Sequence, residues 1–408
     1  MKKLILILIL FFCSSLHAQW IWQNSGTENR ILDVQFINSQ TGWACGDDII
    51  YKTTNAGNNW VIQANPTDNF IEQIYPVDSM VVYAVGWFQT ILKTTNGGTK
   101  WFALRNGPFG GSGSMEGLYF INQNTGWFAG NQFILKTTNG GETFDSIRVP
   151  SYLYDIHFRN ENDGIVCGEV LSFYRTTNGG SNWNKIIMPA SQGHNFYRMS
   201  VISDTIVYLV GHGNKVFRSL NYGINWDTVG NINNQFEQIY CSNFPSYDTG
   251  YAGGTFGKFF KTTNGGVNWR LENTTSFTGF ISSIFFLNNT TGWLVGGGGR
   301  IQYTTSGGQT DVKLISSTVP TDFILNQNYP NPFNPVTNII YEIKKSSYIE
   351  VIVYNSLGKE VQKLVSDFQN TGKYQITFNA ENYNSGVYFY SLSVNGNNIS
   401  TKKMILLK

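Results

Sequence analysis

Six side chains of types that bind or transform polar ligands occur along the chain, most of them separated by roughly 40 residues. They are Glu72, Glu116, Tyr154, Tyr197, Arg198 and Glu237. Carboxylates, phenols and a guanidinium gathered in one place could bind a sugar, a peptide or a cation. Glu72 and Glu116 could also provide the two carboxylates, about 5 to 9.5 Å apart, that glycoside hydrolysis needs. The simpler interpretation is that these positions are polar because they face solvent, so the elements that carry them must be identified first.

A repeated motif marks those elements. Leu92–Trp101 reads LKTTNGGTKW, near-copies begin at Tyr51, Leu135, Tyr174, Phe217 and Phe260, and a degenerate seventh begins at Tyr303. The asparagine of the motif, replaced by Ser306 in the seventh copy, recurs every 39 to 43 residues. Each unit also contains an alternating apolar stretch such as Leu32–Phe36, a second strand such as TGWACG, the KTT strand and a strand that opens on an aromatic residue. Four short strands per repeat of this length indicate a β-propeller blade.

The two ends of the repeat array complement each other. The seventh unit has Asp311 where the fourth-strand aromatic residue is expected, whereas WIWQNSGT from Trp20 matches the fourth strand WVIQANPT from Trp60. An N-terminal strand that completes the last blade would close the ring and remove its exposed edges. The sequence therefore predicts an all-β protein, a seven-bladed β-propeller followed by a small β-sandwich.

The repeated motif is suited to a tight turn between the third and fourth strands. The Asn96 side chain can accept backbone N–H bonds, and the Thr94 hydroxyl can do the same. Gly98 has a glycine at the equivalent position of every copy, which is expected for a residue with positive φ. A phosphate-binding loop would need a following helix, and none is predicted. We therefore expect a structural turn on the face opposite the binding loops.

Alignment of the first strands puts the polar residues at one position. The strand entrance holds Leu32, Glu72, Glu116, Tyr154, Tyr197, Glu237 and Ser282. The next position holds Asp33, Gln73, Gly117, Asp155, Arg198, Gln238 and Ser283. In a closed ring these residues would surround one channel mouth, which is the predicted ligand-binding site. No residue is assigned a catalytic role.

Composition excludes several other functions. The formal net charge is +2, so neither nucleic acid nor an anionic membrane is expected as a partner. After the N-terminal segment three cysteines remain, Cys45, Cys167 and Cys241, and they are expected as small buried residues outside any disulfide framework. Three histidines follow the same segment without ligand spacing. Neither a metal nor a cofactor is predicted.

The motif Thr94-x-Asn96-x-Gly98-x-x-Trp101 resembles the Asp-box of sialidase-type propellers, with Asn in place of the usual Asp. The seven repeats also resemble the photosystem II assembly factor family and sortilin-type ectodomains, which implies a non-catalytic binding propeller. A carbohydrate-active hydrolase is the alternative. Sialidases, however, have six blades and an arginine triad, and xyloglucanase-type enzymes place their site between two propellers.

Both ends of the chain carry signals for export. Lys2 and Lys3 precede the apolar run Leu4–Phe12, so residues 1–18 are predicted as a cleaved signal peptide, with no membrane span in the mature chain. We expect residues 19–313 to form the propeller, residues 314–322 to form a linker and residues 323–408 to form the sandwich. That last segment resembles the type A sorting domain of the type IX secretion system, because it contains the motifs YPNPFNP, VYNSLGKEV, SGVYFYSL and KKMILLK in that order. The resemblance implies engagement with that machinery and passage through the periplasm to the cell surface or the medium.

Overall fold

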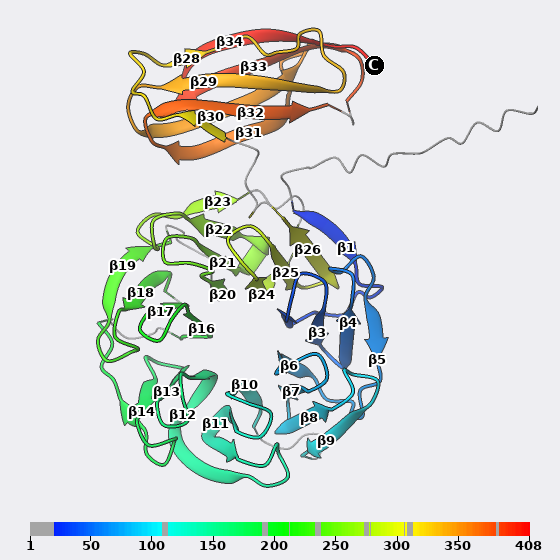
Figure 1. The fold of residues 1–408 in the computed structure, drawn as a ribbon, viewed down its shortest axis with the longest axis vertical. Coiled ribbons are helices and arrows are strands. Elements are labelled where there is room, and N and C mark those ends of the chain that lie inside the picture. Colours follow the sequence, from blue (N-terminus) through cyan, green and yellow to red (C-terminus); the bar gives the residue numbers. More distant parts are fainter. Residues whose placement is uncertain are drawn as a thin grey trace, which may run out of the picture. The chain divides into compact units, whose positions relative to one another are not determined.

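The computed structural model describes residues 20–107, 113–189, 195–211, 213–232, 238–272, 277, 279–305, 307, 313–380 and 383–408. They divide into two compact units, Trp20–Gly307 and a C-terminal unit that follows Gly307. The first unit is a ring of seven four-stranded blades (Figure 1). This confirms the predicted all-β propeller. No helix within the described ranges is both long and apolar enough to cross a membrane.

The first four blades follow one another along the chain. Blade 1 comprises β2 (Asp33–Phe36), β3 (Gly42–Gly46), β4 (Ile49–Thr53) and β5 (Val61–Gln63). Blade 2 comprises β6 (Ile71–Pro76), β7 (Val82–Gly86), β8 (Thr90–Thr94) and β9 (Trp101–Arg105). Blades 3 and 4 form one continuous sheet, which comprises β10 (Met115–Phe120), β11 (Gly126–Thr137), β12 (Asp145–Phe158), β13 (Gly164–Gly168), β14 (Phe173–Thr176) and β15 (Asn184–Lys185). The long strand β11 provides the two middle strands of blade 3. The shared β12 is the outer strand of blade 3 and then the inner strand of blade 4.

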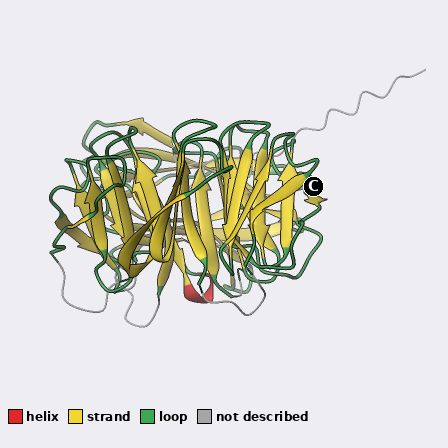
Figure 2. Cartoon of the chain, turned by 90° about the horizontal axis from the view of Figure 1, so that it is seen from below, coloured by secondary structure: helices red, strands yellow, loops and turns green. Residues whose placement is uncertain are grey.

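The remaining blades complete the ring. Blade 5 comprises β16 (Arg198–Val201), β17 (Val207–Val210), β18 (Lys215–Ser219) and β19 (Asp227–Asn231). Blade 6 comprises β20 (Ile239–Asn243), β21 (Gly250–Gly254), the short helix η1 (Thr255–Gly257), β22 (Phe259–Thr262) and β23 (Arg270–Glu272). Blade 7 comprises β24 (Ile281–Phe286), β25 (Gly292–Gly296), β26 (Arg300–Thr304) and, as its outer strand, β1 (Ile21–Asn24). Loops form the two faces of the ring, and η1 lies on one of them (Figure 2).

The N-terminal strand closes the ring, as the sequence predicted. β1 pairs antiparallel with β26 in the register Ile21↔Tyr303 to Asn24↔Arg300. Just before it, Trp20 is buried against Phe259 and Phe286, with ring centroids 5.1 and 5.8 Å apart. Trp20 therefore joins blades 6 and 7 in one apolar cluster.

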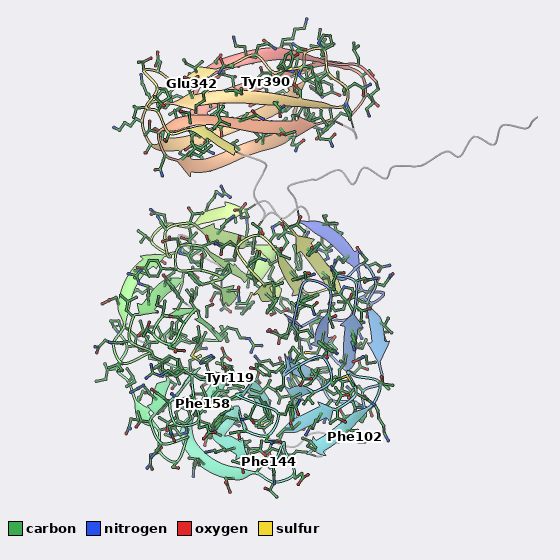
Figure 3. The ribbon with its side chains drawn as sticks, viewed as in Figure 1. Phe102, Tyr119, Phe144, Phe158, Glu342 and Tyr390 are labelled. Atoms are coloured by element: carbon green, nitrogen blue, oxygen red, sulfur yellow. The ribbon has the colours of Figure 1, made fainter. Side chains whose placement is uncertain are left out.

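Stacked aromatic rings connect neighbouring blades. An aromatic side chain on the second strand of one blade stacks face to face on a phenylalanine at the end of the next blade's first strand or directly after it. The stacked pairs are Trp293–Phe36, Tyr83–Phe120, Trp127–Phe158, Tyr208–Phe244 and Tyr251–Phe286, with centroids 3.5 to 3.9 Å apart. In Figure 3, Tyr119 on the inner strand β10 lies near the ring axis, whereas Phe102 on β9 lies at the periphery. The apolar core is thus distributed between blades, which makes the frame stiff.

The repeated motif forms the expected hydrogen-bonded turn. In blade 2 the Thr94 hydroxyl donates to Asn96 Oδ1 at 3.0 Å and accepts the Gly98 N–H at 2.9 Å. Asn96 Oδ1 also accepts the Lys100 N–H at 2.9 Å, and Gly98 has φ +94°. Blades 1 to 6 repeat this pattern of bonds, while Gly308 of the seventh copy lies outside the described residues.

The turn also joins blades. Lys52 Nζ of blade 1 donates to the Gly97 carbonyl of blade 2 at 2.7 Å, and Lys93 Nζ donates to the Gly140 carbonyl of blade 3 at 2.8 Å. The lysine of the KTT strand therefore binds the turn of the following blade. The motif is a structural joint both within a blade and between blades.

Replacement of Gly98 by valine should lower the stability of the propeller. A β-branched residue is poorly tolerated at φ +94°, and the new Cβ would lie 1.9 Å from the Gln63 side-chain oxygen. The backbone strain alone is about 1 to 3 kcal/mol. The check is a melting curve of Gly98→Val beside Thr99→Val, which adds the same kind of side chain at an exposed neighbour. If Gly98→Val melts with the wild type but loses ligand binding, the turn is a binding element.

The C-terminal unit is a sandwich of two four-stranded sheets. One contains β27 (Lys313–Ser316), β32 (Gly372–Asn379), β29 (Val336–Ile343) and β28 (Ile324–Leu325). The other contains β31 (Glu360–Gln369), β30 (Ser347–Asn355), β33 (Gly386–Val394) and β34 (Asn397–Leu406). Between them lies a separate core that includes Tyr341, Val351 and Tyr390. Residues 314–316, which the sequence placed in a linker, belong to β27 and pair with β32.

Candidate functional site

Each blade contributes at least one side chain to the channel mouth, from the start of its inner strand or from the residues just before it. There these side chains line a cavity of about 320 Å³, called here the mouth cavity. Its lining residues are Leu32, Glu72, Glu116, Tyr154, Tyr197, Arg198, Tyr240, Phe280 and Ser282. All seven blades contribute because each inner strand starts at this face.

Five of the six residues predicted from the sequence lie together in this cavity. The sixth, Glu237, lies outside the described residues, and the structure puts Tyr240 at the entrance position of blade 6. A constant spacing identifies Tyr240. In each blade, the residue directly before the second strand lies nine positions after the entrance residue. In blade 6 that residue is Thr249. Phe280 was not predicted, because it lies in a loop whose sequence has no periodicity.

One half of the mouth cavity is aromatic. Rings follow one another from blade 4 to blade 7, with Tyr154–Tyr197 centroids 4.9 Å apart, Tyr197–Tyr240 5.8 Å apart and Tyr240–Phe280 6.2 Å apart. Tyr152 extends the row at 5.2 Å from Tyr154. These rings offer faces and edges to a ligand in the cavity.

The opposite half is acidic. Glu72 accepts a hydrogen bond from the Trp87 indole N–H. Glu116 accepts one from the Tyr152 hydroxyl at 2.6 Å and another from Ser114. Burial and then the nearby charge of Glu116 raise the pKa of Glu72 to about 7, against the opposing effects of Trp87 and Arg198. Part of the Glu72 population is therefore protonated at neutral pH.

One residue further along the inner strands, a second layer joins the blades. Asp33 accepts the Ile74 N–H at 3.1 Å, Gln73 accepts the Leu118 N–H at 2.9 Å, and Asp155 accepts the Met199 N–H at 2.7 Å. In each case the side chain of one blade binds the backbone of the next. These polar residues are part of the frame.

Arg198 is the cation within this layer. Burial disfavours its charged form, but Asp33 and Asp155 outweigh this effect and raise the pKa of Arg198. Burial raises the pKa of Asp155 to about 6, although Arg198 opposes the change. Arg198 Nη1 is buried and has no hydrogen-bond partner within the described part of the chain.

Residues suited to metal binding are not clustered here. Among the described residues there is no group of three or more His, Cys, Asp or Glu side chains that could hold a metal ion. Cys45, Cys167 and Cys241 are free and buried, and burial raises the pKa of each thiol. The arrangement can offer carboxylates, aromatic faces and one buried guanidinium to a ligand.

Comparison with known proteins identifies the C-terminal unit. Residues 327–407 match the family described as the secretion system C-terminal sorting domain. The chain therefore carries a type IX sorting domain, which engages that machinery and directs the protein across the outer membrane to the cell surface or the medium. No curated protein sequence matches the chain.

Solved structures share the propeller fold. YCF48 bound to a D1 peptide is 16% identical with a TM-score of 0.60, and the match covers 70% of this chain and 97% of that one. YCF48 from Cyanidioschyzon merolae is 16% identical with a TM-score of 0.58, covering 70% and 98%. PorZ, a surface component of the type IX secretion system of Porphyromonas gingivalis, is 12% identical with a TM-score of 0.53, covering 93% and 60%. At these identities the likeness establishes the fold alone.

Proposed function

We propose that this exported β-propeller, which carries a type IX sorting domain, is a non-catalytic binding protein for an extracellular glycan or protein. The supporting observation is the mouth cavity, because every blade contributes a side chain to one concave space of about 320 Å³. The stacked rings between blades keep this frame rigid. Pockets of this kind, mostly aromatic with a few charged groups, are suited to binding a small molecule or a side chain.

The surroundings of the site agree with a binding role. The cavity lies on the face that carries the loops between successive blades, and loops on a rigid repeated frame are where recognition usually occurs. One similar solved propeller, YCF48, is described as bound to a peptide. For this chain, peptide binding on the same kind of ring is part of the proposal.

Glycoside hydrolysis is the second candidate function. It is favoured by one observation, the pKa of Glu72, which is raised to about 7 beside the second carboxylate Glu116. A protonated and an ionised carboxyl group in one cavity are the pair that a glycosidase uses as acid and as base or nucleophile. In this alternative Glu72 would be the acid.

Binding to a glycan array and to a panel of extracellular peptides tests the proposal. Tyr197→Ala and Tyr240→Ala should each weaken binding of any ligand found by about tenfold or more, because stacking surface is lost. Phe102→Ala, which removes an exposed ring on the outer strand β9, should leave binding unchanged. Ligands that bind all four proteins equally would show that the site is elsewhere.

The same ligands separate the two functions. Each glycan that binds is incubated with the wild type, and the release of reducing sugar is measured. A binding protein releases none. Release that disappears in both Glu72→Gln and Glu116→Gln, while binding persists, would instead establish the hydrolase.

A further inference from the structure

The mouth cavity is asymmetric in charge, and neither of its two carboxylates is in direct contact with a cation among the described residues. Glu72 and Glu116 form no ion pair within 4.0 Å among the described residues. Among the described residues that line the cavity, Arg198 is the one cation, and its pKa is raised by Asp33 and Asp155 first and then by Glu116 and Glu72. Arg198 therefore serves four carboxylates, and Arg30, the other cation that acts on Glu72, is paired with Asp47, so the described residues leave an excess of negative charge in the acidic half of the cavity.

The aromatic row begins beside the carboxylates, where Tyr152 donates to Glu116, and continues around the cavity from Tyr154. Aromatic faces attract ammonium and guanidinium groups, and such sites combine rings with carboxylates. Neutral sugars also stack on rings, but they do not neutralise a pair of adjacent carboxylates. The described residues hold no group of three or more metal-binding side chains, so an organic cation fits better than a metal ion.

The turns beside the mouth carry exposed apolar side chains in a costly backbone conformation. The turn Trp87–Thr90 has Phe88 and Gln89 at φ +55° and +60°, and the turn Glu169–Ser172 has Val170 and Leu171 at φ +48° and +58°. Turns with two positive φ values favour Asn-Gly or Gly-Gly, and blade 7 uses Gly298-Gly299.

The turns between the second and third strands of blades 2, 4 and 6 each expose a large apolar side chain on the mouth face. Trp87 is 40% exposed, Val170 59% and Phe256 71%. Phe256 occupies the equivalent turn of blade 6, at φ +55°. These three residues, with Phe88 and Leu171, are called here the rim. A β-branched valine at positive φ is a conformational outlier, and retaining it at an exposed tip suggests contact with a partner.

We infer that the mouth cavity receives a lysine or arginine side chain of a protein partner whose apolar residues contact the rim. This inference rests on the binding function proposed above. The cation lies between Glu72 and Glu116, and its aliphatic stem packs on Tyr154, Tyr197 and Tyr240. The rim extends the contact beyond the cavity, which a free small cation would not use.

Short peptides test the cavity. Acetyl-Gly-Lys-Gly-amide and its arginine analogue should bind the full-length protein, measured by ligand-observed NMR, and the norleucine analogue should bind about tenfold more weakly because it has no charge. Glu72→Gln and Glu116→Gln should each lose this preference for charge. Glu142→Gln, which neutralises an exposed carboxylate on the opposite face, should retain it.

The binding should depend on pH. The groups that face Glu72 are Glu116, Arg198, Arg30 and the Trp87 indole, and together with burial they give it a pKa of about 7. A cation prefers the ionised carboxylate, so the lysine peptide should bind about tenfold more weakly at pH 6 than at pH 8. In Glu72→Gln this dependence should be largely lost.

Variants of the rim test the source of the cation. The triple variant Val170→Asn, Leu171→Gly and Phe256→Asn places favourable residues in two turns but also removes the packing of Leu171 on the neighbouring apolar cluster, so a cooperative melting transition is the check that the variant is folded. Lysine peptides flanked by Leu-Leu should bind the wild type more tightly than peptides flanked by Ser-Ser. This advantage should vanish in the triple variant.

Each other outcome contradicts a defined part of the inference. Equal binding of lysine and norleucine peptides would exclude a cation site. Spermidine binding as tightly as the Leu-flanked peptide, with no effect of the rim variant, would assign the cavity to a free small cation. If a neutral glycan binds through Tyr197 and Tyr240 while cationic peptides do not, the proposed binding function stands and this inference fails.

Discussion

A chain that ends at Gly307 should fold its propeller and remain in the periplasm. The unit Trp20–Gly307 contains all seven blades and the closing strand β1, and it takes no strand from the sorting domain. The sorting domain has its own core. Because β27 pairs with β32, the cut must precede Lys313 to avoid leaving an unpaired strand on the propeller.

The measurement is fractionation of cells that have type IX machinery and express the full-length or the truncated chain. Full-length protein should be at the surface or in the medium, and nearly all of the truncated protein should be periplasmic and resistant to protease. A reporter fused to residues 308–408 behind the predicted signal peptide is the matched control, and it should be exported. Export of the truncated propeller as efficient as that of the full chain would show that the sorting signal lies elsewhere.

Replacement of Trp20 by alanine should destabilise the propeller strongly. The side chain is 6% exposed and fills the space between Phe259 and Phe286, so its loss leaves a cavity where the ring closes. Truncation of a buried tryptophan costs about 3 to 5 kcal/mol. Denaturant unfolding of the chain without residues 1–18 measures the change.

The matched control lies two residues away. Trp22 is 43% exposed and stacks on Phe277 at 5.7 Å, so Trp22→Ala should cost about 1 kcal/mol or less. Both variants shorten the same aromatic side chain, but only one removes buried packing at the closure. An equal loss of unfolding free energy in the two variants would mean that ring closure does not depend on the buried packing of Trp20.

The fold could be predicted because its repeated parts are local. The turn at Thr94–Gly98 is fixed by its own side chains, so its sequence signature survives in every blade. Ring closure could be predicted because Trp20 and Trp60 open matching sequences. The strand β27 could not, because its pairing with β32 depends on a partner nearly 60 residues away.

The candidate site was predicted in part. The loops that lead into the inner strands vary in length, and alignment of the first strands placed Glu237 at the entrance position of blade 6. The turn between first and second strands has a constant length, and counting back from Thr249 gives Tyr240. The pairing of Trp87 with Glu72 and of Tyr152 with Glu116 was also missed, because these contacts join a turn or a neighbouring blade to the strand entrance.

The position of β1 sets the order in which the propeller can mature. The strand that leaves the ribosome first is the last to find its place, because its partner β26 is made almost 280 residues later. Until then blade 7 does not exist and the growing array has open edges at both ends. A chain interrupted before Thr304 lacks part of β26 and cannot close the ring. Ring closure therefore requires that the whole propeller has been synthesised. Completeness is thus checked by the architecture itself, before the sorting domain delivers the protein outside.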